Sequence, residues 1–261
     1  MGLRPVCTAL FGTQPGRGLL SINTETGEGT FIGDMGFLST PSLAIDPTTG
    51  IMYAGRGDGN PNLYTVDPNT GATTLVGDTG LGLAAIPALD FRSDGTLFAS
   101  VNIAGAGGTG GDHLAIIGKN TASTTIIGSF GTCTGVTVPS TGGGTCTIEG
   151  MEAIAFSPTG ILFGASRGSA TNLAGLYTIN TSTGAATFHR PIENPDGSTP
   201  SSGVVSLQFC GEILFGGTAT SDIDGGRLII IDPATGFWSF VGSGSATTDG
   251  VSLGGLAGIT R

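Results

Sequence analysis

Two glutamates, Glu149 and Glu152, are the residues in this sequence best suited to chemistry. A sheltered carboxylate can act as a general acid or base, and carboxylate oxygens also bind hard cations. At the place of Glu152, similar stretches of the chain carry Pro41, Pro87, Val205 and Gly254. A charge among such residues is costly without a purpose or a partner. Both glutamates are therefore candidate catalytic residues if the protein is an enzyme. If Glu152 is only structural, it either pairs with a nearby arginine such as Arg167 or is solvated at the rim.

Metal binding through imidazole is nearly excluded, because the chain has only His113 and His189. Calcium is the better candidate, since the loops at 58–60 and 221–226 carry alternating oxygen-bearing residues beside glycine. Neither loop has the full Asp-x-Asp-x-Asp-Gly spacing with a distal glutamate, so ordinary turns remain the alternative. We expect no obligatory cofactor, with calcium as the one optional ion.

A repeated phrase carries these residues. It reads LYTVDPNTGATTLVG at 63–77 and returns at 19–33, 176–188 and 228–242, with a weaker copy at 114–128. A second phrase alternates with it at 41–55, 87–100, 152–166 and 205–217. A period of about 45 residues indicates stacked sheet modules. The Asp-Pro-x-Thr-Gly segments predict strand connectors, because Asp caps a turn, Pro presets φ and Gly accepts the left-handed conformation.

Each module divides into four short strands when it is examined for alternating side chains. Four modules span about 41–79, 86–129, 151–190 and 203–242, and the fifth combines 252–261 with 5–35. These modules resemble the blades of the β-propeller family, especially the "LYxIDPxTGxxTxVG" blades of secreted bacterial propeller proteins. The resemblance implies an all-β fold, a single closed five-bladed propeller over 1–261 with four-stranded antiparallel blades. The last blade is built from both termini, which leaves only short sheet edges.

The four cysteines form two sets. Cys133 and Cys146 bracket an insertion, 132–147, that no other module carries. We predict a disulfide there, since closing such a loop removes roughly 3 kcal/mol of unfolded-chain entropy. Cys7 and Cys210 lie near the same point of neighbouring modules, and either a second disulfide or two buried thiols fits them.

The propeller resemblance also implies a ligand face, where the loops between second and third strands meet the blade-to-blade loops around the central channel. Polar residues on these loops are the candidate binding residues: Asp58, Asn60, Asp112, Arg167, Asn172, Asp222, Asp224 and Asp249. We interpret Trp238 and the alternating phenylalanines as packing between blades, with an aromatic platform for sugars as the less favoured alternative.

Composition excludes several classes of partner. The net charge is −10 and there is no basic stripe, so nucleic acid is a poor ligand. No apolar run reaches the roughly 18 residues of a membrane span, and we expect no membrane insertion. Charged residues are only 11% of the chain and Lys119 is the one lysine. This surface favours an extracellular or periplasmic monomer, although the sequence shows no leader peptide.

Three functions fit these observations. The favoured one is a non-catalytic binding propeller that presents a single loop-rich face to a small molecule, glycan, peptide or surface partner. The first alternative is a hydrolase or lyase with a divalent cation over the channel, although no nucleophile motif or pair of carboxylates on separate blades supports it. The second alternative is a purely structural repeat module.

Overall fold

The computed structural model describes residues 7–16, 18–57, 59–82, 85–103, 111–132, 148, 150–166, 175–200, 203–220, 225–242, 247–248 and 251–260. Within these ranges twenty strands form five four-stranded antiparallel sheets. The predicted fold, a five-bladed β-propeller, is confirmed.

We number the blades I to V and give their strands from the inside outward. Blade I contains β4 (Ser42–Ile45), β5 (Met52–Gly55), β6 (Asn62–Val66) and β7 (Thr73–Asp78). Blade II contains β8 (Ala88–Phe91), β9 (Leu97–Val101), β10 (His113–Ile117) and β11 (Thr124–Ser129). Blade III contains β12 (Met151–Phe156), β13 (Leu162–Ser166), β14 (Gly175–Ile179) and β15 (Ala186–Arg190). Blade IV contains β16 (Val204–Cys210), β17 (Ile213–Thr218), β18 (Leu228–Ile231) and β19 (Trp238–Phe240). Blade V contains β20 (Leu256–Thr260), β1 (Cys7–Gln14), β2 (Gly18–Ile22) and β3 (Gly29–Gly33).

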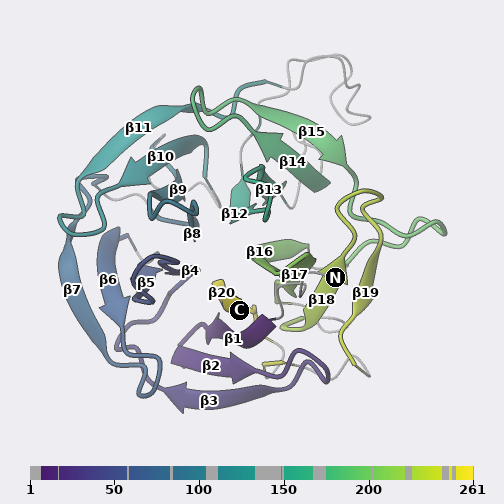
Figure 1. Cartoon of the computed structure of the whole chain (residues 1–261), viewed down its shortest axis with the longest axis horizontal. Coiled ribbons are helices and arrows are strands. Elements are labelled where there is room, and N and C mark those ends of the chain that lie inside the picture. Colours follow the sequence, from purple (N-terminus) through teal and green to yellow (C-terminus); the bar gives the residue numbers. More distant parts are fainter. Residues whose placement is uncertain are drawn as a thin grey trace.

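The blades stand around a central axis, with β4, β8, β12, β16 and β20 innermost and β3, β7, β11, β15 and β19 at the rim (Figure 1). Each innermost strand contacts the innermost strands of both neighbouring blades. The ring is therefore continuous: the unpaired edges of the innermost strands are enclosed around the channel, and those of the rim strands lie on the outside.

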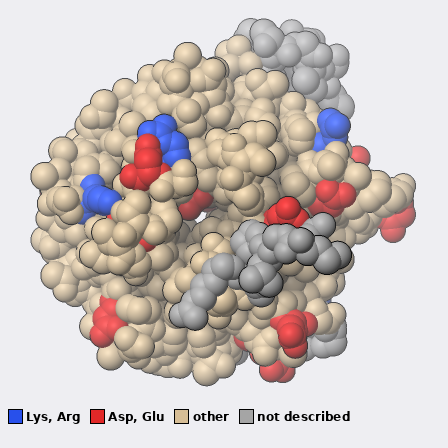
Figure 2. Space-filling view, viewed as in Figure 1, with Lys and Arg blue, Asp and Glu red and all other residues tan. Residues whose placement is uncertain are grey.

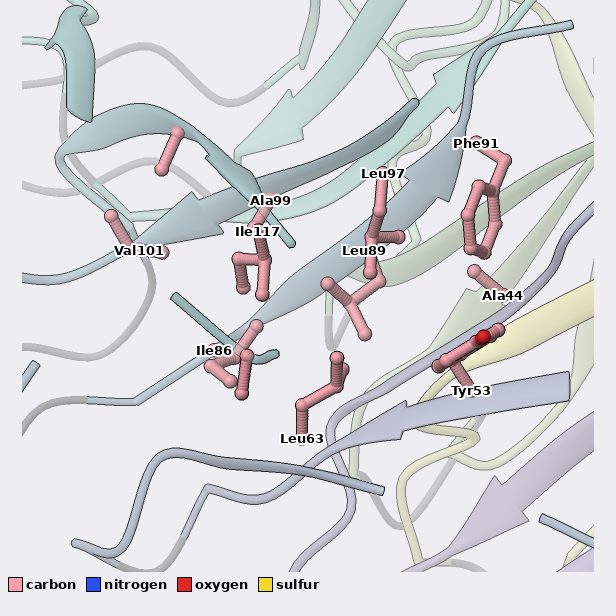
Figure 3. Close-up of a cluster of buried hydrophobic side chains, with 12 residues drawn as sticks. Ala44, Tyr53, Leu63, Ile86, Leu89, Phe91, Leu97, Ala99, Val101 and Ile117 are labelled. Carbon is pink, nitrogen blue, oxygen red and sulfur yellow. The ribbon is translucent and has the colours of Figure 1, made fainter. Parts of the chain in front are cut away.

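The hydrophobic core consists of five clusters, one between each pair of neighbouring blades. In the cluster shown in Figure 3, Tyr53 and Leu63 of blade I face Leu89 and Ile117 of blade II. Both faces of most strands are buried in this way, which explains the nearly continuous apolar runs such as LIII in β18.

Glycines at both ends of the repeated phrase lock neighbouring blades together. Gly71, in the turn of blade I, has a φ of 74°. A Cβ on Gly71 would lie 2.6 Å from the carbonyl oxygen of Gly33, which ends β3 of blade V. Gly184 of blade III meets Gly128 of blade II in the same manner. The Thr-Gly of one blade thus packs on the Val-Gly or Ile-Gly of the blade before it, and this contact explains why the phrase repeats.

Hydroxyl groups form a second link between blades. In four blades a hydroxyl donates a hydrogen bond to a backbone carbonyl of the next blade: Ser42 Oγ to Ile86 O (2.8 Å), Ser100 Oγ to Met151 O (2.7 Å), Ser206 Oγ to Leu253 O (2.8 Å) and Thr13 Oγ1 to Thr40 O (2.6 Å). Each hydroxyl reaches the carbonyl that precedes or begins the innermost strand of the next blade. In blade III the corresponding paired residues are Ala153 and Ala165, which have no hydroxyl. Blade III therefore departs from the pattern of the other four.

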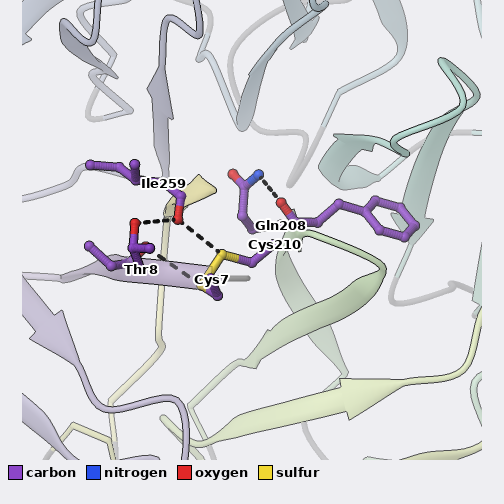
Figure 4. Close-up of a disulfide and its surroundings, with 7 residues drawn as sticks. Cys7, Thr8, Gln208, Cys210 and Ile259 are labelled. Atoms are coloured by element: carbon purple, nitrogen blue, oxygen red, sulfur yellow. Dashed lines mark hydrogen bonds between the residues drawn. A yellow bond between two sulfur atoms is a disulfide. The ribbon is translucent and has the colours of Figure 1, made fainter. Parts of the chain in front are cut away.

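Blade V is closed by both a strand pairing and a disulfide. β20 pairs with β1 in antiparallel register, Leu10 facing Gly258. Cys7 of β1 is bonded to Cys210 of β16, so the disulfide crosses from blade V to blade IV (Figure 4). Of the two possibilities left open for these cysteines, a second disulfide is therefore the correct one. The predicted Cys133–Cys146 disulfide lies outside the described residues.

The Cys7–Cys210 disulfide is characteristic of oxidising compartments outside the cytoplasm. The described part of the chain contains no helix with the length and apolar character needed to cross a membrane.

Candidate functional site

The propeller has two unlike faces. The turn face carries the short connections within the first and last strand pairs of each blade, such as 46–51 and 67–72. The loop face carries the connections between second and third strands and between blades, such as 56–61 and 34–41. The candidate site residues belong to the loop face or to the end of the channel that opens on it.

The turns of the turn face satisfy their own polar groups. Asp67 accepts hydrogen bonds from Asn69 N (2.9 Å) and Thr70 Oγ1 (2.9 Å), and these bonds lower the pKa of its carboxyl. Asp232, Asn23 and Asn180 cap equivalent turns in blades IV, V and III. The cap assigned to Asp in these turns is therefore confirmed, and these carboxylates are occupied by their own turn.

Glu152 lies at the loop-face end of the channel. It belongs to β12, and only 9% of its surface is exposed. Pro41, Pro87 and Val205 line the same cavity, so the positions aligned by the repeat meet around one axis. Among the described residues that line this cavity, Glu152 is the one carboxylate, and most of the others are apolar.

The cavity beneath Glu152 is narrow. Its free volume is about 10 Å³, which is close to the space needed by one water molecule. Aliphatic side chains one layer further in also line it: Leu43, Leu89, Ile154, Leu207 and Leu256. A substrate larger than water could therefore reach Glu152 only from the loop face.

A second buried carboxylate, Asp90, belongs to the innermost strand of blade II, three positions after Pro87, the residue aligned with Glu152. Its oxygens accept hydrogen bonds from Phe156 N (2.6 Å) of blade III and from Phe91 N (2.8 Å). Burial raises the pKa of Asp90 to about 7, against the lowering effect of these two bonds. Asp90 was not among the residues singled out from the sequence. The signal was present, because Ala44, Ala155 and Ala257 occupy the equivalent positions of three other blades.

Two of the predicted binding residues are described on the loop face. Asn60 is exposed in the loop between β5 and β6. Asp112 precedes β10, and its Oδ1 accepts a hydrogen bond from Ile103 N (3.0 Å). Nδ1 of His113 lies 3.0 Å from the same oxygen without hydrogen-bond alignment. Asp112 therefore helps to shape its loop. The other predicted site residues lie outside the described part of the chain: Glu149, Asp58, Arg167, Asn172, Asp222, Asp224 and Asp249.

No group of three metal-ligating side chains occurs among the described residues. His189 is used in blade packing, because its Nε2 lies 2.9 Å from Pro233 O and its ring contacts Phe163. Both calcium loops include residues outside the described ranges, so the calcium prediction stays a prediction.

The aromatic residues divide into two classes. Trp238 packs against Phe240 with ring centroids 5.1 Å apart. Its Nε1 donates a hydrogen bond to Ser198 O, so it ties the rim strand β19 to the segment that precedes β16. The interpretation of all alternating phenylalanines as core was wrong for Phe31, which is 55% exposed on the rim strand β3. The outer side of a rim strand has no neighbouring blade, so alternation there does not imply burial.

Charged groups do not gather into a binding patch on the face shown in Figure 2. Blue and red atoms lie in separate spots around a central hollow. Several of them neutralise each other, as Arg92 and Asp94 do at 2.7 Å. On this face the described charged residues therefore form no broad field of one sign.

Comparison with known proteins identifies the architecture alone. No family model and no curated protein sequence matches the chain. Among solved structures, a chain of a nidogen/laminin complex aligns with a TM-score of 0.57 and 12% identity, covering 95% of this chain and 97% of that one. A gluconolactonase from Xanthomonas campestris aligns with a TM-score of 0.50 and 11% identity, covering 95% and 86%. The same architecture therefore occurs in a protein complex and in an enzyme, and the fold does not choose between binding and catalysis.

Proposed function

We propose that this protein, a single propeller domain over residues 1–261, is a non-catalytic binding propeller of an oxidising, extracytoplasmic compartment. Its loop face would hold one asymmetric site for a glycan, peptide or surface partner. The observation that supports this most is the difference between the two faces. The turn face repeats nearly the same self-satisfied turn in blades I, III, IV and V, whereas the loop face has connections of unlike length and sequence. A lectin with five equal sites would require equal loops.

The narrow channel adds support. A cavity of about 10 Å³ beneath Glu152 cannot enclose a substrate, so an active site there would lack the water-excluding pocket that catalysis uses. The alignment with a chain of a nidogen/laminin complex is compatible with protein binding by this fold.

The test compares arginine substitutions on the two faces, using immobilised glycan and peptide arrays. Leu38→Arg and Asn60→Arg alter exposed loop-face positions, while Ile161→Arg and Asn69→Arg alter exposed turn-face positions. We expect the wild-type protein to bind at least one array member. At least one loop-face variant should weaken that binding by about tenfold, and the turn-face variants should retain it. Absence of any ligand would favour the structural-module alternative, and loss of binding in the turn-face variants would contradict the proposed face.

Catalysis with a divalent cation is the second candidate, and the burial of Glu152 at the channel mouth is what favours it. A cation bound only by the folded protein raises its melting temperature. Chelator-treated wild-type protein and Glu152→Gln should be titrated with calcium, magnesium and zinc. A binding propeller is expected to show no stabilisation that depends on Glu152. A calcium-dependent rise abolished by Glu152→Gln would make the enzyme the favoured function.

A further inference from the structure

A hollow on the loop-face side of blade V is lined by Gln14, Gly16, Phe31 and Asp34, and its volume is about 430 Å³. This volume falls within the roughly 300–1,000 Å³ that is typical of small-molecule sites. The lining residues come from the end of β1, the loop after it, the rim strand β3 and the loop that follows β3. None of them stood out from the sequence as a candidate site residue.

β2 begins with Gly18, which pairs with Gln14. A Cβ on Gly18 would lie 2.3 Å from Gly33 O, and its φ of 113° is unfavourable for any other residue. The equivalent residues are Asn62, His113 and Arg227 in blades I, II and IV, and Gly175 in blade III. Gly18 therefore lets the end of the rim strand approach β2 closely beside the hollow.

An exposed aromatic ring forms the apolar wall. Phe31 is 55% exposed, although phenylalanine is normally buried in this fold. Leu75 of β7 occupies the same place in blade I and is 56% exposed, but it has no aromatic ring. A flat ring presents a surface on which the C–H face of a sugar ring or another flat apolar group can stack.

Polar groups lie beside this ring. Gln14 is only 7% exposed, and within the described part of the chain its amide has no hydrogen-bond partner. Among the described residues, only His113 Nδ1 and Thr124 Oγ1 are buried without a partner, so the Gln14 amide is open to the hollow and can bind water or a ligand there. Asp34 accepts a hydrogen bond from Gly36 N at one oxygen (2.7 Å), which leaves the second oxygen for a ligand. An amide and a carboxylate together can bind neighbouring hydroxyl groups as donor and acceptor.

We propose that this hollow binds one pyranose unit of a saccharide. The ring of Phe31 would stack on its C–H face, while Gln14 and Asp34 would bind its hydroxyls. An anionic ligand is disfavoured by the carboxylate of Asp34. A bare cation is disfavoured because a single carboxylate is too small a ligand set. This inference rests on the proposed binding function. It adds that the ligand is a saccharide and that blade V binds it.

The test uses saturation-transfer NMR on the whole chain with methyl glycosides of glucose, galactose, mannose, fucose and N-acetylglucosamine. We expect at least one glycoside to receive saturation mainly at the protons of one C–H face. Phe31→Ala should abolish this signal. Gln14→Met, which keeps the length of the side chain and removes its amide, and Asp34→Asn should each weaken binding by about tenfold.

Blade I supplies the matched controls. Leu75→Ala removes an equally exposed side chain from the same place, and Asp78→Asn alters a carboxylate that accepts the equivalent bond from Gly80 N (2.8 Å). Both are expected to bind like the wild type, and all variants should melt cooperatively near the wild-type temperature. If Gln14→Met unfolds, Phe31→Ala and Asp34→Asn still decide the outcome, since neither residue is buried.

The proposal is overturned if no glycoside binds the wild-type protein, if Phe31→Ala binds as well as the wild type, or if adenosine and guanosine compete for the same ring. Array binding that is lost in Asn60→Arg but kept in Phe31→Ala would leave the proposed function intact and remove only the saccharide site.

Discussion

The turn face and the loop face are built from the same twenty strands, yet they obey different rules. On the turn face a glycine such as Gly71 touches the neighbouring blade, and a carboxylate such as Asp67 is bonded within its own turn. On the loop face Gly80 has the same φ of 74°, but no atom lies within 4 Å of the position that a Cβ would occupy, and Gln14 lacks a partner among the described residues. The turn face therefore combines a repeated turn with contacts between blades, while the loop face combines fixed links, such as Thr13 Oγ1 to Thr40 O, with connections that vary.

The largest effect is expected from the disulfide, which lies at the turn-face end of β1 and β16. Removing it with Cys7→Ala and Cys210→Ala together frees the unfolded chain over a span of 203 residues. We expect the free energy of unfolding to fall by about 4 kcal/mol, measured by urea denaturation. A loss below that of the Gly71→Ala variant would show that the paired strands β1 and β20 close the ring without help.

Gly71→Ala and Gly80→Ala compare the two faces at equal φ. Both variants place a Cβ on a left-handed residue, which costs about 1–2 kcal/mol. In Gly71→Ala the added carbon also meets Gly33 O at 2.6 Å, whereas at Gly80 it meets open space. We expect a loss of roughly 3 kcal/mol for Gly71→Ala and about 1 kcal/mol for Gly80→Ala. Equal losses would contradict the idea that the close contact of Gly71 with Gly33 stabilises the packing of these two blades.

Lys119→Met tests the ion pair that joins the turns of blades I and II. Lys119 Nζ lies 2.5 Å from Oδ2 of Asp46, whose side chain is fully buried. Burial by itself raises the pKa of Asp46, but hydrogen bonds from Lys119, Thr48 and Thr49 outweigh it and bring the pKa to about 2. Because the folded pKa lies below the unfolded value of about 3.9, this stabilisation is present above pH 4 and is lost as the pH falls toward 2.

The variant should therefore lose about 2 kcal/mol at pH 7, and its difference from the wild type should disappear near pH 2. Thermal unfolding across this pH range measures both. A loss that is independent of pH would mean that the lysine acts through its packing on Phe91 instead.

Asp90→Asn should have the smallest effect at neutral pH and the clearest pH signature. Since the folded pKa of Asp90, about 7, lies above the unfolded value, the folded state disfavours ionisation. The free energy of unfolding of the wild-type protein should therefore decrease by up to about 1.4 kcal/mol for each unit by which the pH rises from 4 to 7. Asparagine removes that slope, and at pH 7 we expect the two proteins to differ by about 1 kcal/mol. Parallel stability curves from pH 4 to pH 8 would show that Asp90 is ionised throughout.

Most of the architecture could be predicted from the sequence, because every blade repeats the same two phrases. The strands follow these phrases closely, and β18 coincides with the predicted 228–231. The repeat also aligned Glu152 with Pro41, Pro87 and Val205, which line one cavity in the structure. The pairing of Cys7 with Cys210 could not be chosen, since a shared repeat position does not fix the distance between two neighbouring blades.

The hollow on blade V could not be predicted, because its lining combines the end of β1, the rim strand β3 and the loops that follow them, and no repeated phrase shows how these segments pack. Phe31 was assigned to the core by its alternation alone. Alternation identifies the two sides of a strand, but it does not say whether a neighbour covers the outer one.

The mixed origin of blade V sets the order in which the propeller can be completed. Gly255 N donates to Thr13 Oγ1, 242 positions earlier in the chain. Blade V can therefore be completed only after nearly the whole sequence has been synthesised. A chain that emerges from a ribosome or a translocation pore presents β1 to β19 first. During that interval the Cys7–Cys210 disulfide can already hold β1 beside β16. Formation of the disulfide would then fix the distance between β1 and β16 before β20 pairs with β1. The redox state of the compartment would thus influence the last step of ring closure.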